Sequence, residues 1–466
     1  PTAILAAAIG LTACTTVTEP YERPAAPIPE ALPVTDASGA VVDPLYWQNI
    51  YQADKLRELV ALALDENRDL RIAAANVQLA RAQYGISRAQ RLPTVTARGS
   101  ATEAGTIGDD NGPSGFNDSA TASVGVTAYE LDLFGRVAAL NEAALQSYLA
   151  SEEGERAARI TIAATVGELW LQLAADKALL QLAEDTVDVQ SESLSLTDEL
   201  LKAGVATELD VRRASATVET ARAQAALFAA QVEQDLNALR FVVGADLPEG
   251  TYDAARLEPM PLSEDIPVAQ SSLVLLTRPD VQQAERQLIP ANANIAAARA
   301  AFFPIVSLTG SVGYSSSELS ELFDGTAGFS FGPSISLPIF DGGARQAQLD
   351  VSEAQREIAI ASYEQAIQSA FRDTADALAV RRTIDERVEA LASLVEDTEV
   401  TLNLSEERFR VGVDDYLSVL DSQQLYYDAR QQLIQANLVR SLNVIAVYRA
   451  LGAWPDRPPA SAQPES

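Results

Sequence analysis

One side chain in this sequence is placed for covalent chemistry, the thiol of Cys14. It is the only cysteine of the chain, and it follows an apolar run that ends in Leu11-Thr12-Ala13. Small residues before a cysteine, at the end of such a run, form the pattern at which an export signal is removed and the thiol is lipidated. We therefore predict that residues 1–14 are a signal-peptide remnant with a lipobox and that Cys14 is the lipid anchor. A chance cysteine after an apolar run is the alternative.

The composition excludes several other kinds of chemistry. The 466 residues include no histidine, so triads that use histidine, imidazole acid–base catalysis and histidine-ligated metal sites are absent. Hydrolysis by carboxylates is compatible with 65 Asp and Glu residues, but no acidic pair stands out at a strand end or cleft. The net charge of −31 argues against a nucleic-acid partner, which needs a basic face. We expect no enzyme: no catalytic residues, no cofactor and no metal.

The chain is a duplication. Five landmarks recur in the same order, about 208 residues apart. They pair Asn67-Arg68-Asp69-Leu70 with Thr277-Arg278-Pro279-Asp280, Arg91-Leu92-Pro93 with Phe302-Phe303-Pro304, Leu131-Asp132-Leu133-Phe134-Gly135 with Leu337-Pro338-Ile339-Phe340-Asp341, Ala203-Gly204-Val205 with Val411-Gly412-Val413, and Val243-Gly244-Ala245 with Leu451-Gly452-Ala453. Each copy predicts a helix, two strands, a very long helix, a tight glycine turn and a second long helix.

The repeats divide the chain into successive regions. A proline-rich segment over 15–45 is expected to run extended, because proline cannot sustain helix or central strand. The first repeat covers 46–244, a linker covers 245–276, and the second repeat covers 277–454. The tail over 455–466 has too few apolar residues to order.

Four segments alternate between apolar and small polar residues, two in each repeat. They lie near 93–103, 119–132, 304–315 and 327–340. Strands of about ten residues with one apolar and one polar face are what a transmembrane β-barrel requires, although a soluble sandwich has the same local pattern. Four strands cannot close a membrane barrel, so several chains would have to share one. The loops at 103–118 and 315–326 would then lie outside the cell.

The long helices carry the remaining mass. No proline lies between Gly135 and Gly204, so about 66 residues, or roughly 100 Å, can be helical. Two apolar rows lie about 200° apart on this helix. They are Leu173, Leu180, Val187, Leu194 and Leu201, and Leu182, Val189 and Leu196. Two rows predict a helix packed on both sides, as in a wall of helices; a two-stranded coiled coil, which needs one row, is the alternative.

These features resemble the TolC-type outer membrane efflux protein family, in its lipoprotein branch. The strongest motif is the run Glu407-Arg408-Phe409-Arg410-Val411-Gly412-Val413-Asp414-Asp415-Tyr416-Leu417-Ser418-Val419-Leu420-Asp421, which looks like the family's tip turn. The resemblance covers the chain from Cys14 to Trp454. It implies a mainly α fold with a transmembrane β-barrel portion: a homotrimer whose twelve-stranded barrel is continued by an α-helical barrel.

The resemblance also implies a function. The protein would be the outer membrane exit duct of a tripartite efflux or secretion system. It would conduct substrates passively from a periplasmic adaptor and an inner membrane pump to the exterior. It would sit in outer membrane lipid, anchored by its lipid and extending into the periplasm. The alternative is a periplasmic coiled-coil adaptor or scaffold, but such adaptors have one helical hairpin, whereas this sequence predicts two.

Within that family, carboxylates near the helical tips form a gate, and Asp421 matches this position. Leu417, one turn earlier, matches an apolar constriction in related members. A second acidic position of the family falls on Ser418, and Asp210, opposite Ser418 by the repeat offset, could supply the charge instead.

The tip turns themselves are assigned to Gly204 and Gly412. For each aspartate beside a turn the alternative role is a helix cap. We expect that role for Asp414 and Asp415.

Overall fold

The structure is a computed structural model of the chain, and it describes residues 21–33, 46–107, 113–263, 271–324 and 327–452. Cys14 and the tail over 455–466 lie outside the described residues. The chain forms two compact units, each assembled from segments that are distant in the sequence. Among the described residues, the first unit comprises those up to Ala25, those of Asn76–Glu152 and those of Gln283–Glu364; the second comprises those of Ala26–Ala75, those of Glu153–Gln282 and those from Gln365 onward.

The order of elements is that of a duplication. The first copy runs α4 (Arg68–Ala89), β1 (Val95–Ile107), β2 (Pro113–Leu131), α5 (Arg136–Lys202) and α6 (Glu208–Val243). The second runs α8 (Pro279–Ala300), β3 (Ile305–Ser316), β4 (Gly328–Ser336), α9 (Ala344–Arg410) and α10 (Tyr416–Ala450). Shorter elements are α2 (Trp47–Ile50), α3 (Asp54–Glu66), α7 (Thr251–Ala254), η2 (Ser272–Thr277) and η3 (Leu319–Glu321). The predicted duplicated unit is confirmed.

The two longest helices have the length that the sequence allows. Helices α5 and α9 contain 67 residues each, and neither includes a proline. The structure places one apolar row of α5 in contact with neighbours: Leu173 is fully buried, and Leu180 and Val187 are half-buried. The second row is covered only at its start, since Val189 and Leu196 are 49% and 48% exposed. The chain by itself therefore packs one flank of this helix and leaves much of the other open.

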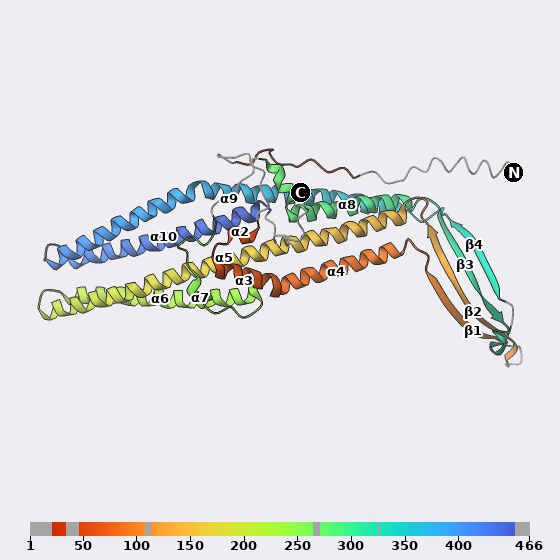
Figure 1. Ribbon diagram of the computed structural model, residues 1–466, viewed down its shortest axis with the longest axis horizontal. Coiled ribbons are helices and arrows are strands. Elements are labelled where there is room, and N and C mark those ends of the chain that lie inside the picture. The colour runs from red at the N-terminus through yellow and green to blue at the C-terminus, as the bar shows by residue number, and fades with distance from the viewer. Residues whose placement is uncertain (1–20, 34–45, 108–112, 264–270, 325–326, 453–466) are drawn as a thin grey trace, which may run out of the picture. The chain divides into compact units, whose positions relative to one another are not determined.

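The strands of the first unit form one antiparallel sheet. Their spatial order, β1-β2-β3-β4, is also their chain order, so each strand pairs with its neighbours in sequence (Figure 1). The outer edges of β1 and β4 have no partner strand within the described chain. In water, such unpaired N–H and C=O groups are a template for another chain, and in hydrocarbon they must be paired.

The strand ends differ from those expected from the alternation. Strand β1 continues to Ile107 and β2 begins at Pro113, so most residues of the loop expected at 103–118 belong to these two strands. Strand β4 ends at Ser336, although the alternation continues to residue 340. Pro338 follows two residues beyond this end, but Pro333 lies within β4, as an edge strand permits.

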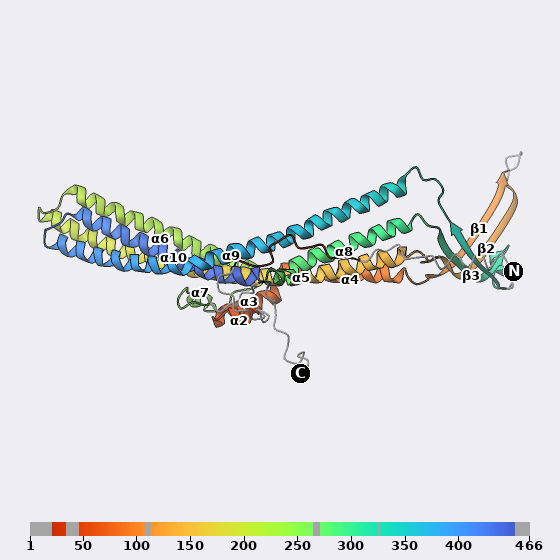
Figure 2. The same cartoon turned by 90° about the horizontal axis from the view of Figure 1, so that it is seen from above.

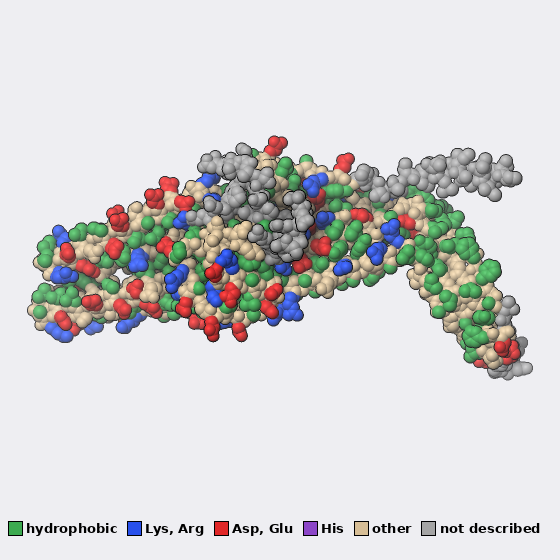
Figure 3. Space-filling model, viewed as in Figure 1, with side chains coloured by type: hydrophobic (Ala, Val, Ile, Leu, Met, Phe, Trp, Pro, Cys, Tyr) green, Lys and Arg blue, Asp and Glu red, His purple; other side chains and the backbone are tan. Residues whose placement is uncertain are grey.

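The two faces of the sheet differ as predicted. On one face, hydroxyl groups pair across the strands, and the pairs are Ser100 with Thr121 (2.8 Å), Ser307 with Ser334 (2.7 Å) and Ser311 with Ser330 (2.9 Å). The other face is apolar and open, with Phe329 87%, Ile335 71% and Phe331 70% exposed. Figure 3 shows hydrophobic side chains gathered over the strands and charged side chains mostly over the helices. Among the described helices, none is both long enough and apolar enough to cross a membrane.

Short helices pack beside the long ones in the second unit (Figure 2). Tyr51, which follows α2, is completely buried, and its hydroxyl donates to the carbonyl oxygen of Ala163 at 2.8 Å. Gly167 makes room for this ring, because a Cβ there would lie 2.7 Å from the Tyr51 hydroxyl oxygen. Gly167 of α5 is therefore a packing requirement.

In each repeat the first sequence landmark contacts the last one, and we call this contact the joint of the repeat. In the first repeat, Asn67 Nδ2 donates to the carbonyl oxygen of Val242 at 2.6 Å. Gly244, at φ 76°, passes so near that a Cβ would lie 2.6 Å from the carbonyl oxygen of Glu66.

The second repeat makes the same joint with different side chains. Arg278 Nη1 donates to the carbonyl oxygen of Ala450 at 2.8 Å, and a Cβ on Gly452 would lie 2.7 Å from Arg278 Cγ. Since Ala450 and Gly452 follow Val242 and Gly244 by 208 residues, the sequence landmarks mark a repeated contact.

Candidate gate at the helical tips

The turns between the long helices have the same backbone structure in both repeats. Gly204 and Gly412 adopt φ of 77° and 75°, which L-residues rarely adopt. Two N–H groups bond back in each turn, as in a Schellman motif: Gly204 to Leu201 and Val205 to Leu200, and Gly412 to Phe409 and Val413 to Arg408, all at 2.9 Å. No neighbouring atom would meet a Cβ on either glycine, so the backbone conformation alone requires them.

The helix caps that follow these turns use the same two kinds of side chain in opposite positions: the N-cap is a hydroxyl residue in the first repeat and a carboxylate in the second. In α6, Thr207 is the N-cap, and Asp210 accepts from its N–H at 2.9 Å and its hydroxyl at 2.6 Å. In α10, Asp415 is the N-cap and accepts from the N–H of Ser418 at 3.2 Å and its hydroxyl at 3.0 Å. The hydrogen bonds from Thr207 hold the pKa of Asp210 below its usual value. Both Asp210 and Ser418 thus direct their side chains at a cap.

The predicted cap role holds for Asp415 and is wrong for Asp414. Arg408 donates to Asp414 through Nε at 2.6 Å and Nη2 at 2.8 Å, across the turn. These hydrogen bonds lower the pKa of Asp414. The corresponding residues of the first repeat are Leu200 and Ala206, whose apolar side chains cannot make such a pair.

A buried tyrosine holds the two hairpins together near their tips. Tyr416 is 5% exposed, its ring lies 5.4 Å from that of Phe409, and its hydroxyl is 2.8 Å from the Ser193 hydroxyl. Val419 and Ala214 pack in the same cluster. Because these residues come from α5, α6, α10 and the end of α9, the cluster ties both hairpins into one body.

The face of the first turns of α10 that points away from the Tyr416 cluster is open to solvent. Leu417 is 44% exposed, and Asp421, four residues later and hence on the same helix face, is also exposed. Within the described chain, the Asp421 carboxylate makes no hydrogen bond or ion pair. The structure thus presents a free carboxylate and an apolar side chain on one surface, which suits them to a shared passage.

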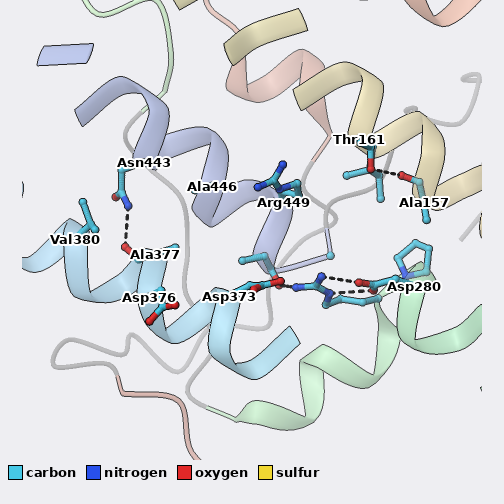
Figure 4. Close-up of a pocket in the computed structure, with 15 residues that line it drawn as sticks. Ala157, Thr161, Asp280, Asp373, Asp376, Ala377, Val380, Asn443, Ala446 and Arg449 are labelled. Carbon is cyan, nitrogen blue, oxygen red and sulfur yellow. Dashed lines mark hydrogen bonds and ion pairs between the residues drawn. The ribbon is translucent and has the colours of Figure 1, made fainter. Parts of the chain in front are cut away.

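A second place that gathers charged side chains is a cavity of about 390 Å³ in the second unit (Figure 4). Asp280, Asp373 and Asp376 line it together with Arg278 and Arg449. Arg278 is already paired with Asp280 at 2.6 Å, and Arg449 lies 3.4 Å from Glu168. The cavity surrounds the contact of Arg278 with Ala450 in the second repeat, and Arg449 joins α10 to α5 through Glu168.

One further carboxylate, that of Asp235, has a raised pKa. Burial, together with a hydrogen bond and repulsion from Asp176 on α5, raises the pKa of Asp235 on α6 to about 7. Asp176 itself is 6% exposed and accepts from Gln172 at 3.0 Å. Two carboxyl groups thus meet at one helix–helix contact, and protonation of Asp235 relieves the repulsion between them.

The sequence did not reveal the partners of the tip residues. The pair Arg408–Asp414 spans a turn, whereas Ser193 with Tyr416 and Gln190 Nε2 with Gln423 Oε1 (2.9 Å) join distant parts of the chain. The one available signal was the turn itself, because a Schellman motif brings the residues on its two sides together.

The sequence matches a family model described as outer membrane efflux protein over residues 59–245 and 271–453. These two stretches follow the two repeats. Among curated proteins, it is 40% identical over 444 residues to the solvent efflux pump outer membrane protein SrpC of Pseudomonas putida, covering 93% of this chain and 94% of that protein. It is also 40% identical over 456 residues to the outer membrane protein OprJ of Pseudomonas aeruginosa, covering 96% and 94%.

Solved structures have the same fold. The open-state structure of the Neisseria gonorrhoeae MtrE outer membrane channel superposes with a TM-score of 0.86 at 36% identity, covering 94% of this chain and 98% of that one. A crystal structure of a membrane protein from Pseudomonas aeruginosa gives 0.87 at 38% identity, covering 95% and 99%.

Proposed function

The chain belongs to the outer membrane efflux protein family, and on that premise we propose that three copies of it close into one exit duct. As a member of that family it is an outer membrane channel of an efflux system, which sets aside the periplasmic adaptor alternative. The number of copies and the parts of the duct are the proposal.

The observation that carries the proposal is the four-stranded sheet with free edges and an exposed apolar face. Hydrocarbon tolerates no unpaired strand edge, and single-chain barrels use eight or more strands. Three sheets joined β4 to β1 would give twelve strands, with Phe329 and Phe331 toward lipid and the paired serines toward water. The open row of Val189 and Leu196 on α5 supports a neighbouring chain at the helices as well.

Chemical crosslinking of the detergent-solubilised protein tests the assembly. We expect a ladder that ends at three subunits. A ladder that ends at one or two subunits, from protein that retains its β content, would refute the trimer.

The lipid anchor is proposed at Cys14, from the lipobox. The variant Cys14→Ser is expected to lose labelling by a fatty-acid precursor while trimers still form in the outer membrane, because the sheets already provide a membrane belt. Labelling that persists in the variant removes Cys14 as the anchor.

The gate is proposed at Asp421 and Leu417, where three chains would bring their tips together. Converging carboxylates attract cations, and exposed leucines narrow the same passage. Asp210 and Ser418 lie in the corresponding turns and hold their side chains at the caps, so we assign the ring charge chiefly to Asp421.

Planar-bilayer recordings separate the two roles. We expect Asp421→Ala to weaken block by trivalent cations with little change in conductance, and Leu417→Ala to raise conductance with little change in block. If neither variant differs from the unmodified channel, the gate lies elsewhere and Asp210→Ala is the next variant to record.

The remaining partners follow from the family. We propose a periplasmic adaptor and an inner membrane pump, with small organic compounds as cargo, since relatives at 40% and 39% identity are named for solvent and toluene efflux. Deleting the gene and measuring survival in toluene, with and without a plasmid copy, tests the cargo. Unchanged survival of the deletion strain would contradict it.

A further inference from the structure

We propose that Arg408 sets the charge of the duct entrance: by pairing with Asp414 across the second tip turn, it cancels a carboxylate that would otherwise add to the ring of Asp421 side chains. This inference rests on the gate proposed above. It makes Arg408 a residue that tunes ion selectivity without itself lining the constriction.

The turn brings the two residues together before their side chains meet. Arg408 lies in the last turn of α9, and its carbonyl oxygen accepts from the N–H of Val413 at 2.9 Å and of Asp414 at 3.4 Å. Asp414 is thus held beside the α9 end by its backbone. The guanidinium then reaches it with two parallel bonds of 2.6 and 2.8 Å, the geometry in which arginine binds a carboxylate most specifically.

The pair is partly open to solvent, so its role is better sought in charge than in stability. The side chains are 56% exposed for Arg408 and 26% for Asp414, and exposed pairs contribute little to folding. Charge at a narrow entrance acts differently, because fields at short range inside a constriction are only partly screened.

The first tip lacks this device. Leu200 and Ala206 stand where Arg408 and Asp414 stand in the second. Its nearest ion pair, Lys202 with Asp198 at 2.6 Å, links two residues of the same helix and does not span the turn. A matched control is therefore available: Lys202→Gln removes one positive charge from a tip without uncovering Asp414.

Charge and turn geometry predict opposite patterns in block by a trivalent cation such as hexamminecobalt. If the charge matters, Arg408→Gln uncovers Asp414 and tightens block about tenfold, and Asp414→Asn uncovers Arg408 and weakens block by a similar factor. The double variant Arg408→Gln/Asp414→Asn has no net change of charge and should return to within about twofold of the unmodified channel. We expect Lys202→Gln to change block less than Arg408→Gln does.

Several results would overturn the inference. If both single variants shift block in the same direction and the double variant shifts it by a similar amount, the pair only shapes the turn. If Lys202→Gln matches Arg408→Gln, the tip responds to total charge and not to this pair. Asp421→Ala, recorded in parallel, keeps the two proposals apart. If Asp421→Ala weakens block and Arg408→Gln does not change it, this inference alone is refuted. If Arg408→Gln tightens block and Asp421→Ala does not change it, the assignment of Asp421 alone is refuted.

Discussion

Of the eight described glycines with a positive φ, five have φ values within 3° of one another but different surroundings, which permits a controlled test of the structure. Their φ values are 77° at Gly204, 76° at Gly244, 78° at Gly250, 75° at Gly412 and 75° at Gly452. An alanine in this left-handed region costs about 1 kcal/mol by itself. That cost should be common to all five alanine variants.

The difference between the sites comes from what the new methyl group would meet. At Gly204, Gly250 and Gly412 nothing lies within 4 Å, so the conformational cost of about 1 kcal/mol should be the whole effect. At Gly244 the methyl would lie 2.6 Å from the carbonyl oxygen of Glu66, which is backbone and cannot move aside. Overpacking of this kind adds about 1 to 3 kcal/mol, so Gly244→Ala should lose about 2 to 4 kcal/mol.

Gly452→Ala should fall between these limits. Its methyl would lie 2.7 Å from Cγ of Arg278, a side chain that can shift only by loosening its bonds to Ala450 and Asp280. The midpoint of thermal or guanidinium unfolding, followed by circular dichroism in detergent, ranks the five variants. Equal losses at all five sites would refute the close approaches at Gly244 and Gly452, and with them the joint that we infer for each repeat.

Three further predictions test the second unit. Tyr416→Phe should lose about 1 kcal/mol through its bond to Ser193, and Tyr416→Ala about 3 to 5 kcal/mol, measured by the same unfolding midpoints; equal losses would contradict the packing of its ring. Asp415→Ala should cost about 1 kcal/mol and Asp415→Ser much less, because serine also caps helices, and a serine variant as weak as alanine would argue against the cap. The pKa of Asp235 is raised in the folded chain, so the native protein binds an extra proton and its stability should fall as pH rises from about 4 to 7. Asp235→Asn should therefore raise the melting temperature at pH 8 and change it little at pH 5. A variant that melts at a lower temperature than the unmodified protein at pH 8 would contradict the buried pair with Asp176.

The sequence predicted most of the architecture because its main signals are local or periodic. An absence of proline over a long stretch permits a long helix, glycine forces a left-handed turn, and strict alternation specifies a two-faced strand. Strand ends were less well predicted, since side chains at 103–118 suit both strand and loop. Pairing with the neighbouring strand decided the matter there, extending β1 to Ile107 and starting β2 at Pro113.

The candidate site divides in the same way. Asp421, Leu417 and the turn glycines could be named from the motif, and one cap, Asp415, from its place before a helix. The capping box of Thr207 with Asp210 has a spacing that the sequence shows, although the sequence analysis did not use it. The pair of Asp414 with Arg408 could not be named, because Asp414 had several possible partners within reach.

What the sequence by itself determined is the repeated order of elements, the two faces of each strand and the position of each turn, because these depend on residues near one another in the chain. What the tertiary structure decided is which charges remain free at the tips. A carboxylate is neutralised or left bare according to the groups that the turn and the neighbouring helices bring within reach. Thus Arg408 pairs with Asp414 across the turn, whereas Asp421 keeps an open surface, a distinction that composition and spacing alone do not contain.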